Sequence, residues 1–192
     1  MLGELENLAG RYQLRFRRTL GHPPEKVWRA LTEPEHLRAW FPADIEGERV
    51  AGARLHFVFR NDEGDPTDGE MLVYDPPSVL EFSWGEELLR FELEPEGDGT
   101  ATVLTFLNTF DELGKAARDA AGWHACLDLL AYEVAGEAPP WSPMERWEQV
   151  HADYVERLGP EASTIGPPES GREEGVTPAA HTLRASAPEN GR

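Results

Sequence analysis

Apolar and polar positions alternate along residues 11–20, which predicts the first strand of a sheet. In this segment, RYQLRFRRTL, the residues Tyr12, Leu14 and Phe16 fall on one side and mostly arginines on the other. A period of two is typical of a half-buried strand. Similar short segments recur between about residues 53 and 110, with hairpin-length links such as PEGDGT between them. They predict an antiparallel meander.

Two short helices are predicted between the first strand and this meander. The segment PPEKVWRAL, residues 23–31, has proline at its start, an acid in its first turn and an apolar stripe. These are helix-start signals. A second start follows at once, with Thr32 as a candidate N-cap and Pro34 in the first turn. Because Pro42 comes soon afterwards, the second helix has room for only about two turns.

A long helix is predicted after the last strand. Trp123, Leu127, Leu130 and Val134 recur at helical spacing and form one apolar stripe. Gly122 lies at the start of this stripe, and a glycine costs about 1 kcal/mol inside a helix. We therefore expect Gly122 to allow the helix to approach the sheet closely.

The two ends of the chain are predicted to lie outside the main domain. Residues 1–7 are expected to be a flexible N-terminus, and residues 137–159 a helical extension. Residues 160–192 contain five prolines, four glycines and no aromatic residue. Such a segment cannot bury enough apolar surface to offset its chain entropy, so a disordered tail is predicted.

Residues 8–136 then predict an α+β domain of the helix-grip type. A curved antiparallel sheet is wrapped around the long C-terminal helix, and two short helices follow the first strand. One face of the sheet is apolar, and the long helix is the element available to cover it. Apolar spaces between such layers are common ligand sites.

Four segments in this order resemble a known family. They are PPEKVWRALTEPEHLRAWF, GEMLVYDPPSVLEFSW, TVLTFLNTF and GWHACLDLLA. They resemble the START-like, or SRPBCC, superfamily, and within it the group similar to the C-terminal domain of the heat-shock-protein-90 ATPase activator. That superfamily includes lipid and steroid carriers, aromatic-polyketide cyclases and co-chaperone domains. The resemblance implies the fold, and either a small hydrophobic ligand or a chaperone or other protein partner.

The family's layout places Trp40 and Phe41 at one end of the cavity. There they would act either as a plug of the core or as a gate that contacts ligand. The predicted sheet face and helix stripe supply the other candidates for a ligand-binding cavity. The full set is Trp40, Phe41, Phe57, Phe59, Met71, Val73, Phe82, Trp84, Phe91, Trp123, Leu127 and Leu130.

Charge and composition narrow the classes of partner. With 36 acidic and 18 basic residues the net charge is −18, which disfavours nucleic acid and anionic membrane surfaces. The acidity serves either solubility or the docking of a basic partner. No apolar run approaches the roughly 20 residues of a membrane span, and the N-terminus lacks a signal-peptide pattern. We therefore predict a cytoplasmic protein; its single cysteine, Cys126, agrees with a reducing compartment.

The sequence offers no catalytic, metal-binding or cofactor-binding pattern. His124 and Cys126 are two apart on a helix and point in different directions, and the histidines lack metal-ligand spacing. The acids of residues 62–70 do not match a calcium loop and are better explained as a solvated hairpin loop. If Leu55 and Phe57 point inward then His56 points outward, whereas the reverse phase would place His56 in the cavity.

We therefore predict non-catalytic binding of a small hydrophobic ligand, or a co-chaperone-like accessory role. Two alternatives remain open. An enzyme of the cyclase or dehydratase kind would need an ionisable group on the concave face. A pure interaction module would have a cavity filled by its own side chains.

Overall fold

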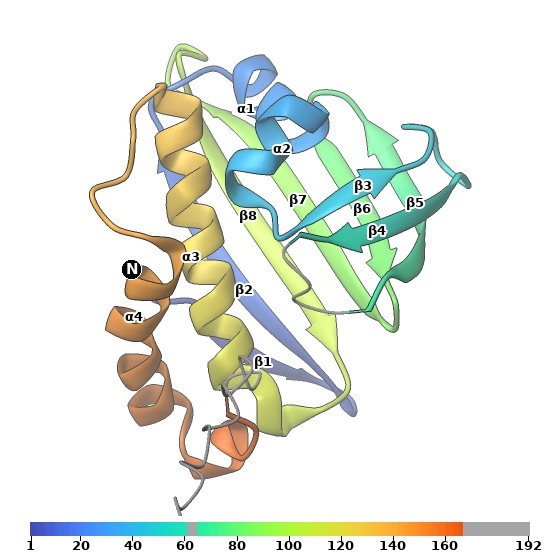
Figure 1. Ribbon diagram of the computed structural model, residues 1–192. Helices are drawn as coiled ribbons and strands as arrows, with labels where there is room; N and C mark the ends of the chain where they lie inside the picture. Colours follow the sequence, from blue (N-terminus) through green and yellow to red (C-terminus); the bar gives the residue numbers. More distant parts are fainter. Residues whose placement is uncertain (61–64, 167–192) are drawn as a thin grey trace, which may run out of the picture.

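The computed structural model describes residues 1–60 and 65–166 and contains one eight-stranded antiparallel sheet (Figure 1). The order across the sheet is β1-β2-β8-β7-β6-β5-β4-β3. The strands are β1 (Glu4–Leu8), β2 (Arg11–Leu20), β3 (Ala43–Glu46), β4 (Arg54–Phe59), β5 (Thr67–Asp75), β6 (Val79–Trp84), β7 (Glu87–Glu96) and β8 (Ala101–Phe110).

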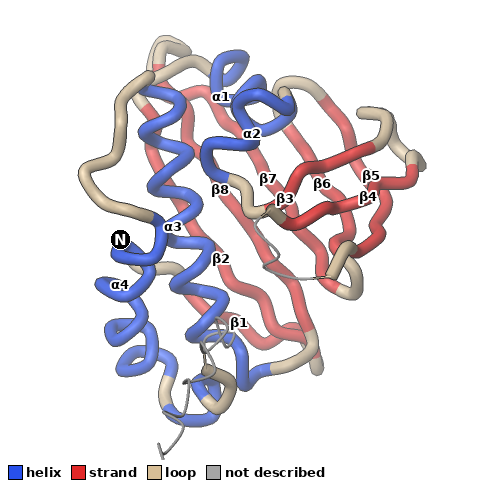
Figure 2. The backbone as a smooth tube through the Cα atoms, in the orientation of Figure 1, coloured by secondary structure: helices blue, strands red, loops and turns tan. Residues whose placement is uncertain are grey.

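Helix α3 lies along the concave face of this sheet, with α4 beside it (Figure 2). The helices are α1 (Pro24–Thr32), α2 (Pro34–Trp40), α3 (Ala116–Ala135) and α4 (Pro143–Leu158), and two short 3-10 turns are η1 (Leu113–Lys115) and η2 (Pro160–Ser163). The predicted α+β helix-grip fold is confirmed, including the two short helices after the first long strand.

Local sequence explains where the helices begin and end. Helices α1 and α2 both start at a proline, whose fixed φ suits the first turn and whose missing N–H is not needed there. Helix α3 ends at Gly136, which adopts a positive φ of 72°. Helix α4 starts with a capping box, in which the side chain of Ser142 accepts from the N–H of Glu145 and the Glu145 side chain accepts from Ser142 N–H.

Alanines, rather than Gly122, allow α3 to approach its neighbours closely. Ala117, Ala120 and Ala121 are fully buried. A Cβ added at Gly122 would meet no atom within 4 Å. The expected role of Gly122 is therefore wrong, because this position on α3 faces open space.

Both ends of the domain carry more structure than the composition indicates. Residues 1–7 were expected to be flexible, but residues 4–7 belong to β1, which pairs with the first half of β2. Residues 160–166, expected to be disordered, contain η2: Ala162 is buried, and the N–H of Ile165 donates to the carbonyl of Gly114 at 3.0 Å. Residues 167–192 lie outside the described part of the chain. Within that part, no helix has both the length and the apolar character that crossing a membrane requires.

Candidate functional site

The space between the sheet and α3 is occupied by aromatic side chains. Nine of the twelve predicted cavity residues are buried: Trp40, Phe41, Phe57, Met71, Phe82, Phe91, Trp123, Leu127 and Leu130. Phe59 and Trp84 are half-buried and pack against them. These residues form one continuous cluster, which we call the aromatic interior.

Phe41 lies at the centre of the aromatic interior although it belongs to a connection. It follows the last residue of α2 and has an extended backbone, so its ring turns inward as the chain leaves the helix. Ring centroids lie 5.4 Å from Trp40, 6.2 Å from Phe82, 5.6 Å from Trp84 and 6.0 Å from Trp123. The ring is 1% exposed, and it therefore plugs the interior.

Val73 lies on the other face of the sheet. The pairing of β5 with β6 shifts register between Met71 and Val73, so that Val73 pairs with the outward-facing Glu81. Such a bulge inserts one extra residue and reverses the alternation after it. Tyr74 takes the inward position instead and contacts the ring of Trp28 at 5.3 Å. Strict alternation could not show this shift.

Hydrogen bonds from two arginines hold the segment that carries Phe41 in place. The guanidinium of Arg60, after the end of β4, donates hydrogen bonds to the carbonyl oxygen of Phe41 and to the Asp44 carboxylate, the latter at 3.2 Å. Arg38 on α2 donates to the same carboxylate at 3.3 Å. These contacts tie the connection between α2 and β3 to the neighbouring strand.

The aromatic interior reaches the surface at Phe59 and Trp84. Their rings stack with centroids 5.6 Å apart, and both are half-buried. Trp84 also contacts Phe41 and Trp123, so it joins the surface to the plug.

A polar cluster lies beside Trp84 and Trp123 at the edge of the aromatic interior, since Glu87 pairs with Trp84 across β6 and β7, and no prediction from the sequence includes it. Trp123 Nε1–H donates to Oδ1 of the fully buried Asn108 at 3.1 Å, and Asn108 Nδ2 donates to Glu87 Oε2 at 2.7 Å. Lys115 donates to the second oxygen of Glu87 and lies 3.3 Å from Asp119. On β8, Asn108 alternates with the buried Phe106 and Phe110 and therefore points to the same side of the sheet. A polar residue in this alternating pattern is the sequence signal that could have indicated the cluster.

The charges of this cluster compensate one another. Burial by itself would lower the pKa of Lys115, but the carboxylates of Asp119 and Glu87 outweigh it and raise that pKa above its ordinary value. Lys115 is therefore charged at neutral pH. Its ammonium group neutralises Glu87 at the edge of an otherwise apolar region.

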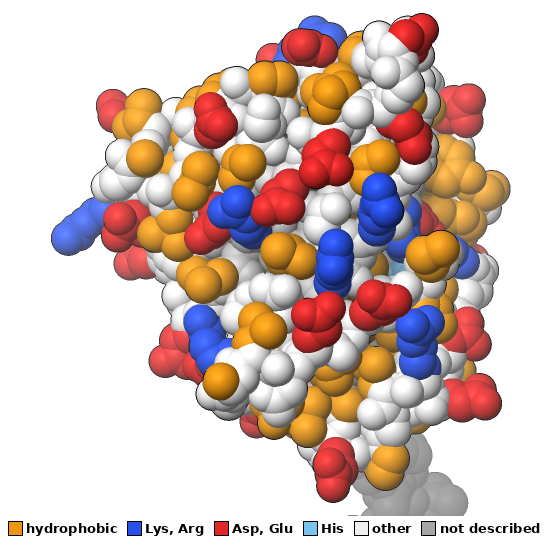
Figure 3. Space-filling model, turned by 180° about the vertical axis from the view of Figure 1, so that it is seen from behind, with side chains coloured by type: hydrophobic (Ala, Val, Ile, Leu, Met, Phe, Trp, Pro, Cys, Tyr) orange, Lys and Arg blue, Asp and Glu red, His pale blue; other side chains and the backbone are white. Residues whose placement is uncertain are grey.

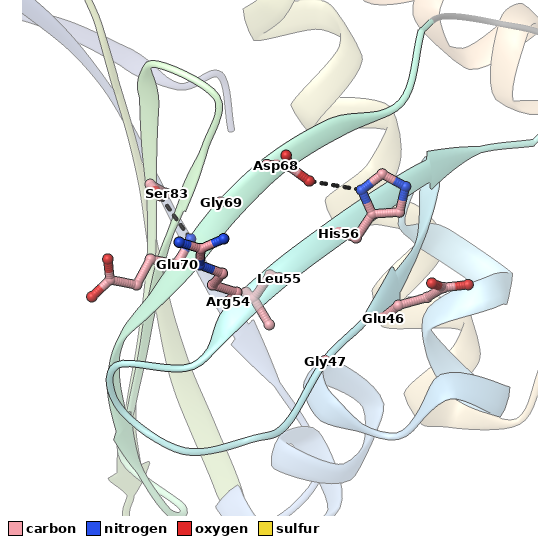
Figure 4. A pocket seen from close by; sticks show the side chains of 9 residues that line it. All are labelled: Glu46, Gly47, Arg54, Leu55, His56, Asp68, Gly69, Glu70 and Ser83. Carbon is pink, nitrogen blue, oxygen red and sulfur yellow. Dashed lines mark hydrogen bonds and ion pairs between the residues drawn. The ribbon is translucent and has the colours of Figure 1, made fainter.

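His56 faces away from the aromatic interior. Leu55 and Phe57 are buried and His56 is exposed, with its Nδ1 2.8 Å from Asp68 Oδ1. Figure 4 shows both on a surface hollow of about 540 Å³ that also includes Arg54. None of the twelve predicted cavity residues lines this hollow, nor a second one of about 320 Å³ lined by Asp128, Ala131, Tyr132, Trp141 and Arg146.

His124 is buried between α3 and α4. Its Nδ1 lies 3.0 Å from the hydroxyl of Tyr154, and its Nε2 lies 3.4 Å from Asp128 Oδ2. Arg146 donates to the same carboxylate oxygen at 2.8 Å. This group fastens α4 to the domain and does not reach the aromatic interior.

Among the residues that the structure describes, one group of side chains could hold a metal ion, although none was predicted from the sequence. Ligand atoms of Glu33, Glu35 and His36 all lie within 4.8 Å of one another, and His36 Nδ1 lies 2.7 Å from Glu133 Oε1. Because exposed carboxylates often gather without an ion, we assign no metal here.

The convex face of the sheet mixes both signs of charge. Figure 3 shows basic, acidic and apolar side chains interspersed on the side opposite to that of Figure 1. Arg90, for example, pairs with both Glu81 and Glu92. The acidic excess is therefore not a uniform patch on this face.

The fold and the aromatic interior together define a helix-grip protein of the SRPBCC type. The chain belongs to the family described as activator of Hsp90 ATPase homolog 1-like protein, whose model matches residues 21–135. A comparison with curated proteins gives no match.

Solved structures share the fold at low sequence identity. A conserved protein of unknown function, EF2215 from Enterococcus faecalis, aligns with a TM-score of 0.67 at 22% identity, covering 81% of this chain and 90% of that one. CalU16 from Micromonospora echinospora aligns at 0.63 and 20% identity, covering 81% and 95%. Protein BPP1335 from Bordetella parapertussis aligns at 0.56 and 28% identity, covering 81% and 92%.

Proposed function

We propose that this protein is a non-catalytic binding protein, and that its ligand is a small hydrophobic molecule that takes the place of the Phe41 ring. The observation that carries the proposal is the position of Phe41. A residue of a connection fills the middle of an aromatic cluster that the sheet and α3 enclose. Arg60 hydrogen-bonds the Phe41 carbonyl and the Asp44 carboxylate. Because Phe41 belongs to the connection between α2 and β3, its ring can move out of the interior without unpairing a strand.

Because the Phe41 ring fills the interior, displacing it lowers the apparent affinity for a ligand. Burying a phenylalanine side chain stabilises a structure by about 1.5–3 kcal/mol, so a state with Phe41 withdrawn has a population of roughly 1–10%. The apparent affinity falls by the same factor. We therefore expect micromolar or weaker binding of generic aromatic molecules.

An accessory role toward a protein partner is the second candidate. The observation that favours it is the same packing: an interior filled by its own side chains serves as a rigid framework without any ligand. The family's description, which refers to an activator of a chaperone ATPase, agrees with this role. An enzyme of the cyclase or dehydratase kind has less support, because Glu87 and Lys115, two ionisable groups beside the interior, are paired with each other.

Removing the plug separates the two candidates. In the Phe41→Ala variant the ring is lost, so naphthalene should bind at least ten times more tightly than to the wild type, as measured by calorimetry and thermal stabilisation. In the wild type, naphthalene should quench tryptophan emission. Trp84→Ala should reduce that quenching, whereas Trp147→Ala, on α4, should not.

A failure of both proteins to bind apolar molecules would contradict the proposal. If neither the wild type nor Phe41→Ala binds naphthalene or a panel of fatty acids up to their solubility limits, the ligand-binding proposal is overturned. The accessory role would then be the better explanation of the filled interior.

A further inference from the structure

Asn108, fully buried beside Trp123 in the aromatic interior, has hydrogen-bonding capacity to spare. Its amide offers two N–H donors and two acceptor lone pairs. Trp123 Nε1–H can only donate and the Glu87 carboxylate only accepts, so the orientation of the amide is fixed by these partners. Among the described residues these are its side-chain partners, which leaves one N–H and one lone pair unused.

The amide is within reach of the space that Phe41 fills. Asn108 on β8 pairs with Leu89 on β7, which pairs with Phe82 on β6. Neighbouring strands are about 4.8 Å apart, so Asn108 lies roughly 10 Å across the sheet from Phe82. Phe41 packs on Phe82, and Trp123 contacts both Phe41 and Asn108. A molecule the size of two fused rings that replaces the Phe41 ring therefore lies against Trp123, and a polar group on it reaches the amide where the buried side chain of Leu89 moves aside.

The charges around Asn108 decide which polar group fits. Glu87 Oε2 lies 2.7 Å from the amide nitrogen, and Asp119 lies beyond Lys115. Lys115 already neutralises Glu87, so the cluster offers no unpaired cation to a ligand carboxylate, which would lose its hydration there without a partner of opposite charge. A pure hydrocarbon would leave the amide's spare capacity unused. A hydroxyl group both donates and accepts, so it matches the free lone pair and the free N–H.

We propose that Asn108 selects for ligands that carry one neutral hydroxyl group on a hydrophobic frame of about two rings. This inference rests on the proposed function, because it assumes that ligand takes the place of the Phe41 ring. Asn108 is then the residue that distinguishes a hydroxylated ligand from the hydrocarbon and from the acid of the same shape.

Three probes of one shape test this selection: naphthalene, 2-naphthol and 2-naphthoate, measured by calorimetry on the full chain and on Phe41→Ala. One net hydrogen bond corresponds to about a 3- to 10-fold gain in affinity, so 2-naphthol should bind that much more tightly than naphthalene. The acid 2-naphthoate should bind least. In Asn108→Leu, a change of similar shape, 2-naphthol and naphthalene should bind equally.

A second variant keeps the test valid if Asn108→Leu fails to fold. Glu87→Gln retains the Asn108 amide and leaves Lys115 without one of its two carboxylate partners, so the affinity for 2-naphthoate should rise by roughly tenfold or more toward that of 2-naphthol. Equal binding of naphthalene and 2-naphthol to the wild type and to Phe41→Ala would overturn the role of Asn108 while leaving the proposed function intact. Absence of binding by all three probes and by the panel of fatty acids would overturn both.

Discussion

The hydroxyl of Tyr154 on α4 lies 3.0 Å from Nδ1 of His124 on α3, and both side chains are buried. The same hydroxyl oxygen accepts a hydrogen bond from the N–H of Gly3 at 2.8 Å. One side chain therefore links the N-terminal segment, α3 and α4. Both α4 and the N-terminal segment lie outside the residues matched by the family model.

Tyr154 should make the fold sensitive to alkaline pH. Burial raises its pKa from 10.0 to about 12. Because the folded-state pKa is raised, the stabilisation is complete below about pH 10 and is lost as the pH rises through about 12. A difference of this size corresponds to roughly 3 kcal/mol.

Tyr154→Phe should remove this alkaline dependence and lower stability at pH 7 by about 1–3 kcal/mol, since the buried N–H of Gly3 loses its acceptor. Urea unfolding between pH 7 and pH 12 measures both effects. Tyr132→Phe, on α3, retains Tyr154 and should keep the wild-type profile. An unchanged profile in Tyr154→Phe would show that another group governs the alkaline transition.

Asp128 should contribute stability that is lost in acid. Burial would raise the pKa of its carboxyl, but hydrogen bonds from His124 and Arg146 outweigh burial and lower it. With a lowered folded-state pKa, the contribution is present above the unfolded value of about 3.9 and disappears as the pH falls through the folded value. Asp128→Asn should be less stable than the wild type at pH 7, and the difference should shrink in acid. Asp153→Asn, an exposed change on α4, should match the wild type throughout; a pH-independent loss in Asp128→Asn would contradict the assignment.

Alternation along the chain was enough to predict the layers and most of the aromatic interior, because inward positions of a half-buried strand must be apolar. It could not predict Val73, since a register shift changes the face without changing composition. Asn108 was missed for a related reason: a buried amide looks polar in sequence, and only its partners Trp123 and Glu87 account for its position.

Elements at the two ends were missed because their stability comes from distant contacts. Strand β1 is mostly exposed and has little apolar pattern, and it forms through pairing with β2. The partners of the buried His124 were likewise not predictable, because Tyr154 and Arg146 lie on α4, more than 20 residues further along the chain. Local patterns carry no information about such pairings over long separations.

Gly122→Ala should stabilise the protein by about 1 kcal/mol. An added Cβ meets open space, and alanine has the higher helix propensity. Thermal unfolding should show a Tm about 2–4 °C higher for a chain of this size. Gly114→Ala provides the contrast, because its Cβ would lie 2.2 Å from Thr164 Oγ1 and should lower the Tm. Loss of stability in Gly122→Ala would restore the expectation of close packing at this position.

Arg60→Met should loosen the plug and strengthen ligand binding. It removes the hydrogen bonds to the Phe41 carbonyl and to Asp44, and bonds to charged groups contribute about 1.5–3 kcal/mol. Even part of this free energy would raise the withdrawn population of Phe41 and the apparent affinity for naphthalene about tenfold. Arg38→Met loses only its bond to Asp44 and should change the affinity less. Equal effects of the two variants would mean that the bonds to Asp44, rather than the bond from Arg60 to the Phe41 carbonyl, determine how readily the Phe41 ring withdraws.

Residues 160–166 should stabilise the domain although their composition suggested a disordered tail. Ala162 is buried, and the N–H of Ile165 donates to Gly114 in η1. Two truncations separate these residues from the rest: one ends at Gly166 and the other at Gly159. Because only the shorter chain loses these contacts, its Tm should be lower by several degrees, as about 1 kcal/mol corresponds to 2–4 °C at this size. Identical Tm values for the two truncations would show that η2 contacts the domain without stabilising it, as expected of a segment outside the main domain.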